Sequence, residues 1–149
     1  MTTRHVETLY CDDIRQEIGG KLSFVGVYSG SLFVQTFPAT LAKLCLSVRV
    51  VTPASKPLRS LTLLVLRDEE VLQEIIVEKE QLDAASDSSG ALGKEHVQVA
   101  QFFLVFSPIT FENPCVLRVQ AQTEEGDCRG ISLDVGLPPP SGSSEDTQT

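Results

Sequence analysis

Hydrophobic and polar residues alternate along much of this chain. The clearest stretch is 43–50, where Leu44, Leu46, Val48 and Val50 are separated by mainly polar residues. Successive side chains of a β-strand point to opposite faces of its sheet. The pattern therefore predicts a strand with one apolar face toward a core and one polar face toward water.

The same period of two recurs along the chain. Strands are expected at 4–11, 21–28, 31–35, 60–66, 71–78, 97–106, 116–123 and 130–135. Helix is expected only as a short turn at Glu80 to Ala85. Eight or nine short strands at roughly ten-residue spacing are typical of an all-β sandwich of antiparallel strands, with a closed barrel as the alternative.

The strands belong to one expected domain over residues 1–136. Residues 137–149 contain Pro138-Pro139-Pro140 and then mainly Ser, Gly, Glu and Asp, with nothing to bury. This composition predicts a disordered tail.

Charge narrows the classes of partner. The net charge is −8 and the basic residues are scattered singly, which argues against nucleic acid and against an anionic membrane surface. No leader pattern is visible at the N-terminus, so a cytoplasmic location is expected. The cysteines Cys11, Cys45, Cys115 and Cys128 should then be reduced thiols. If the last hairpin turns at Glu124 to Asp127, Cys128 lies opposite Thr123 and does not face Cys115.

Acidic residues gather in two segments. Asp12, Asp13 and Glu17 are expected in one loop, and Asp68, Glu69 and Glu70 in a charged turn. If consecutive strands run antiparallel, both segments fall at the same end of the sandwich, where carboxylates could bind Ca²⁺. Solvated turn charges are the simpler reading of the same residues.

No catalytic pattern is present. The chain has no Gly-x-Ser-x-Gly elbow, no Walker spacing and no Cys-x-x-Cys pair. No cofactor and no enzymatic activity are therefore expected. The sequence favours a non-catalytic protein-interaction or structural module, and the alternative is a domain that binds a small ligand or Ca²⁺.

One segment is the expected contact surface. Leu32, Phe33 and Val34 form an apolar run without a charge to discourage strand pairing. An edge strand here would pair with a protein partner or with a second copy. In the competing interpretation Leu32 and Val34 point into the core and Phe33 packs under a loop.

The N-terminal third also carries a family pattern. It consists of Cys11-Asp12-Asp13, Gly20-Lys21-Leu22-Ser23, Gly26-Val27-Tyr28, Phe37-Pro38 and the strand from Leu44. This resembles small bacterial proteins catalogued only as a domain of unknown function, over roughly 6–78 and more weakly over 114–136. The resemblance implies an immunoglobulin-like β-sandwich and a bacterial source, but no activity.

Overall fold

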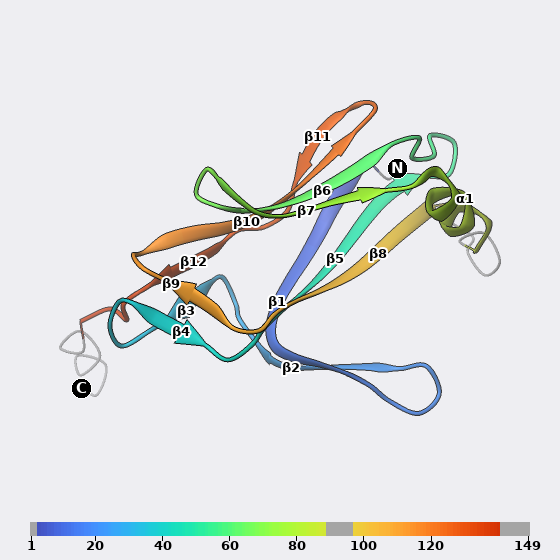
Figure 1. The fold of residues 1–149 in the computed structure, drawn as a ribbon. Helices are drawn as coiled ribbons and strands as arrows, with labels where there is room; N and C mark the ends of the chain where they lie inside the picture. The colour runs from blue at the N-terminus through green and yellow to red at the C-terminus, as the bar shows by residue number, and fades with distance from the viewer. Residues whose placement is uncertain (1–2, 89–96, 141–149) are drawn as a thin grey trace, which may run out of the picture.

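The fold is built mainly from β-strands. The computed structural model describes residues 3–88 and 97–140, and this part of the chain is mainly strand (Figure 1). The strands are β1 (His5–Gln16), β2 (Leu22–Val27), β3 (Ser31–Phe33), β4 (Ala39–Leu41), β5 (Leu44–Pro53), β6 (Leu61–Arg67), β7 (Glu70–Val77), β8 (Val97–Phe106), β9 (Ile109–Phe111), β10 (Cys115–Thr123), β11 (Gly126–Arg129) and β12 (Leu133–Gly136), and the helix is α1 (Lys79–Ser88). The expectation of a mainly β chain is confirmed.

The strands form three sheets. One has the order β2-β1-β5-β8, a second has the order β3-β12-β10-β6-β7 with β11 also paired to β10, and β4 pairs with β9. The first two lie in separate layers in Figure 1. The expectation that all strands are antiparallel is wrong, because β3 runs parallel to β12.

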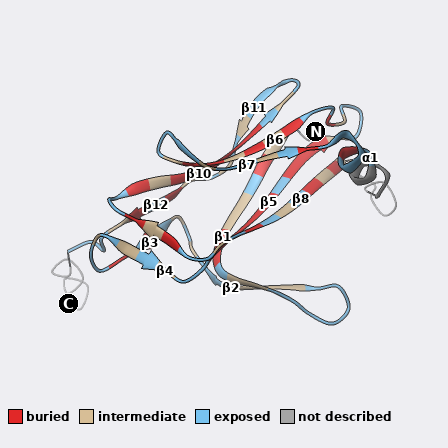
Figure 2. Cartoon of the chain, in the orientation of Figure 1, coloured by how far each residue is buried: buried red, intermediate tan, exposed pale blue. Residues whose placement is uncertain are grey.

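A single core joins the two larger sheets (Figure 2). Leu44, Leu46, Val48 and Val50 of β5 are all fully buried in it, which confirms the apolar face predicted from the alternation. The opposite face of β5 is less exposed to solvent than expected, because Ser47 on that face is only 5% exposed.

Strand β1 continues beyond the expected end at Cys11. It pairs with β5 up to Cys11 and with β2 from Cys11 to Gln16, so β1 and β2 form a hairpin that projects from the sheet, here called the arm (Figure 1). Gly19 and Gly20 turn the chain at its tip with φ of 88° and 78°, a region of backbone conformation that favours glycine. The expected break at Asp12-Asp13 is therefore wrong.

Two of the expected local elements are confirmed. The strand pair around Asp68 is the antiparallel hairpin β6–β7. The helical turn expected at 80–85 is the longer helix α1, whose Leu82 is 1% exposed within the core. Burial of this leucine explains why a polar segment with weak helical signal forms a helix here. No helix in the described ranges is long and apolar enough to cross a membrane.

A hydrogen bond and an ion pair also connect segments of the two larger sheets. The buried Tyr10 hydroxyl of β1 donates a hydrogen bond to the Ile131 carbonyl at 2.9 Å, and burial raises the pKa of Tyr10. Near the N-terminus the Arg4 guanidinium lies 3.0 Å from a Glu124 carboxylate oxygen, and the two side chains are 8% and 24% exposed. We call this pair the clasp.

The expected tail falls mostly outside the described residues. Strand β12 ends at Gly136, and residues 137–140 follow without regular structure. Residues 141–149 lie outside the described ranges.

Candidate functional site

The first acidic group is built into the base of the arm. Asp12 and Asp13 lie on β1 rather than in a loop. The Tyr28 hydroxyl donates to Asp12 Oδ1 at 2.6 Å, and a Cβ at Gly26 would collide with this carboxylate. Gly26, with φ of 69°, therefore makes room for the aspartate. These contacts give Asp12 a structural role.

Asp13 is also engaged. Its Oδ1 accepts a hydrogen bond from Lys43 Nζ at 2.6 Å, and this bond lowers the pKa of Asp13 and raises the pKa of Lys43. Glu17 lies past the end of β1, at the turn of the arm, where its backbone N–H donates to the Lys21 carbonyl. The three residues expected in one loop are thus spread along the arm.

The second acidic group shapes a turn. Asp68 has φ of 54°, and its carboxylate accepts a hydrogen bond from the Val116 N–H at 3.0 Å. Glu70 forms an ion pair with Arg67 at 3.0 Å. Throughout the described part of the chain, no group of three or more His, Cys, Asp or Glu side chains could hold a metal ion. The geometry therefore adds nothing to the Ca²⁺ alternative.

The expected contact segment lies at a sheet edge but is mostly buried. Strand β3 is the outermost strand beside β12. Leu32 is 1% exposed and Val34 is 8% exposed, as the competing interpretation of this segment expects. Their side chains point into the core because the strand alternates faces, and this leaves only Phe33, 56% exposed, at the surface.

Exposed apolar side chains lie at the two margins of the outer face of the sheet β2-β1-β5-β8, whereas Cys11 and Cys45 between them are buried. The register aligns Val27 with Cys11, Cys11 with Cys45, and Cys45 with Val105, which places these side chains in one row across four strands. Val27 is 51% exposed and Val105 is 57% exposed. Phe103, 43% exposed, lies beside the row on β8. We call the exposed part on β8, Phe103 and Val105, the β8 patch.

The β8 patch adjoins a long sheet edge. Strand β8 pairs with β5 over ten residues and is the last strand of its sheet in the described structure. Its sequence, VQVAQFFLVF, contains no charged residue and no proline. Helix α1 contacts β8, and the Gln98 amide donates a hydrogen bond to the Leu82 carbonyl at 3.1 Å. In the described structure the part of this edge toward Phe106 is therefore the part open to pairing with another strand.

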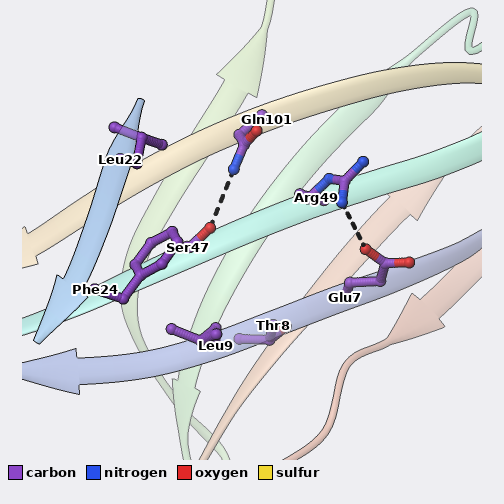
Figure 3. A pocket seen from close by; sticks show the side chains of 8 residues that line it. All are labelled: Glu7, Thr8, Leu9, Leu22, Phe24, Ser47, Arg49 and Gln101. Carbon is purple, nitrogen blue, oxygen red and sulfur yellow. Dashed lines mark hydrogen bonds and ion pairs between the residues drawn. The ribbon is translucent and has the colours of Figure 1, made fainter. Parts of the chain in front are cut away.

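A hollow of about 410 Å³ lies between the arm and the same outer face. Figure 3 shows Leu22 and Phe24 of β2 on one side of Ser47 and Gln101, and Arg49 and Glu7 on the other. The Gln101 amide donates to Ser47 Oγ at 3.1 Å. Across the hollow, Arg49 and Glu7 form an ion pair at 3.3 Å. Leu22 and Phe24 of the arm thus cover Ser47, which accounts for its burial. The Ser47 hydroxyl is bonded to an amide and not to a base that would activate it as a nucleophile.

Comparison with known proteins identifies the family of this chain. Residues 8–136 match DUF6941, a family of unknown function. The chain belongs to DUF6941. The match confirms a domain of unknown function and also covers 79–113, which the sequence resemblance left out. No curated protein matches this DUF6941 chain.

The cysteines yield a prediction for this DUF6941 member. All four are free, and Cys11 and Cys45 are directly opposite each other on β1 and β5. Burial raises the pKa of Cys11 and of Cys115, which makes their thiolates scarce. We expect four thiols to react with a chromogenic disulfide when the protein is purified without reductant and denatured. A count of two would instead indicate a Cys11–Cys45 bridge.

The fourth cysteine corrects an expected register. The sequence predicted Cys128 opposite Thr123, but Cys128 pairs with Ala121, because the hairpin turn contains only Glu124 and Glu125. Cys115 pairs with Val135 in the same sheet. The conclusion that Cys115 and Cys128 do not face each other is confirmed.

Proposed function

We propose that this chain is a non-catalytic protein-interaction module of the bacterial cytoplasm, built on an immunoglobulin-like β-sandwich. Support for the sandwich comes from the two layered sheets and the core between them. A net charge of −8 supports a protein partner over nucleic acid or an anionic membrane. Four free cysteines suit a reducing compartment.

The observation that carries the proposal is the β8 edge together with the β8 patch. Exposed apolar residues scattered singly are ordinary, but here Phe103 and Val105 lie on the same face of an uncharged strand at the end of a sheet. A bound polypeptide strand would gain backbone hydrogen bonds from the edge and side-chain contacts from the patch.

Site-specific photo-crosslinking tests this proposal. Benzoylphenylalanine replaces Val105 in one variant and the exposed Glu74 of β7 in a matched control, and both are irradiated in the organism that makes the protein. We expect the Val105 probe to form an adduct with a polypeptide that mass spectrometry identifies, and the Glu74 probe to form none. Adducts with both probes, or with neither, would contradict the proposal.

A further inference from the structure

We infer that the partner strand at the β8 edge is β8 of a second copy of this chain, paired antiparallel across a two-fold axis. The two sheets of order β2-β1-β5-β8 then join into one continuous sheet. This inference rests on the proposed function, because it names the partner of the same surface.

The other sheet edges are poor candidates for self-pairing. Strand β7 carries Glu70 and Glu74, and antiparallel pairing of two copies would bring like carboxylates together. Strand β3 has three residues. Strand β2 is uncharged, but Gly26 with φ of 69° interrupts its extended conformation. By contrast β8 offers ten residues without a charge and without a positive φ.

Side-chain chemistry along β8 suits pairing with itself. Phe103 and Val105 share the outer face. A two-fold axis that crosses β8 at Phe103 places the Phe103 side chains of the two copies against each other, with the Val105 side chains beside them. On the inner face Phe102 is only partly buried at the margin of the core. The added strand would cover its exposed side and extend the core across the junction.

Charge also favours this place of contact. Each copy carries a net charge of −8, so two copies repel each other over most of their surfaces. An edge strand without carboxylates is where two such chains approach at the smallest electrostatic cost. Pairing across a two-fold axis uses up both β8 edges, so assembly ends at a dimer and does not continue into a filament.

Sedimentation equilibrium of the full chain across the micromolar range tests the inference. We expect the wild-type protein at twice 16.2 kDa. The Phe103→Lys and Val105→Lys variants should sediment as folded monomers, with dimerisation weakened at least about 100-fold, because the lysines are repelled and desolvated at the junction. The matched control Ile76→Lys changes a residue that is 65% exposed on β7 and should remain a dimer.

Two further variants make the result specific. An equimolar mixture of Phe103→Lys and Phe103→Glu should return to the dimer mass, because opposite charges meet only if the partner is a second copy. Phe33→Lys, which tests the edge expected from the sequence, should stay dimeric. Loss of the dimer in Phe33→Lys, with Phe103→Lys unaffected, would move the contact to β3 and overturn the inference.

Other outcomes separate this inference from the proposed function. A wild-type protein that is monomeric throughout the range overturns self-pairing, whereas an adduct of the Val105 probe with a different polypeptide would still support an interaction module. Hydrogen exchange keeps the test decisive if a lysine variant unfolds. The β8 amides of the wild-type protein should exchange more slowly as its concentration rises, and concentration-independent exchange would overturn self-pairing.

Discussion

A Leu46→Asp variant is expected to lose at least about 4 kcal/mol of unfolding free energy, and to be largely unfolded if the wild-type protein is only marginally stable. Leu46 of β5 is fully buried in the core shared by both larger sheets. A carboxylate at this position has no cation or hydrogen-bond donor prepared for it, and its desolvation opposes folding. Urea denaturation followed by far-UV circular dichroism measures the loss.

The control for this prediction needs an exposed position. Alternation alone suggested Ser47→Asp, but Ser47 is 5% exposed under the arm and bonded to Gln101, so an aspartate there would not lie in water. Gln73 of β7 is exposed, and replacing it with aspartate introduces the same side chain as Leu46→Asp. Gln73→Asp should change the unfolding free energy by less than about 1 kcal/mol. Equal urea midpoints for Leu46→Asp and Gln73→Asp would show that the faces of β5 are misassigned.

A Glu124→Gln variant is expected to lose about 2–3 kcal/mol at neutral pH. The substitution leaves the largely buried Arg4 guanidinium of the clasp without its counter-charge. It also weakens the hydrogen bonds that the N–H groups of Arg59 and Ser60 donate to Glu124 Oε1 at 2.9 and 3.2 Å. Urea midpoints of both proteins at neutral pH measure this difference.

The difference should also depend on pH. Burial of Glu124 disfavours its charged form, but the hydrogen bonds from backbone N–H groups and from Arg4 outweigh burial and lower its pKa from 4.5 to about 2. A lowered pKa means that the folded state is stabilised fully above pH 4.5 and loses this stabilisation as the pH falls toward 2. The wild-type and Glu124→Gln proteins should therefore become equally stable near pH 2. A difference that stays constant down to that pH would contradict the role given to the clasp.

Sequence alternation predicted the elements whose partners are close in the chain. The inward face of β5 follows from its own period of two, and the hairpin β6–β7 follows from two apolar strands around a charged turn. Helix α1 was expected one turn long, because its stability comes from burying Leu82 against distant residues and not from its own sequence.

Elements that depend on distant contacts were not predicted. Strand β1 continues through Asp12 and Asp13 because Tyr28 donates a hydrogen bond to Asp12 and Lys43 donates one to Asp13. Neither donor lies close enough in the sequence to be seen in the local pattern. The parallel pairing of β3 with β12 joins segments about a hundred residues apart. Such long-range pairings determine at which end of a sheet a charged group lies. The expected grouping of six carboxylates at one end therefore could not be predicted from the sequence.

The candidate surface was missed for a related reason. Every residue of β8 is uncharged, so the sequence gives no polar face that would identify Phe103 and Val105 as exposed. The available signal was the complete lack of charge over ten residues, which suits either a buried strand or an unprotected edge. Only the strand order, with β8 last in its sheet, decides between them.

The path of β1 has a mechanical consequence. The backbone of β1 pairs with β5 from His5 to Cys11 and with β2 in the arm from Cys11 to Gln16. It bends where it enters the arm (Figure 1). A force on the tip of the arm is therefore transmitted along one strand to the hydrogen bonds between β1 and β5, and it reaches the strand that carries Leu46 without crossing a loop.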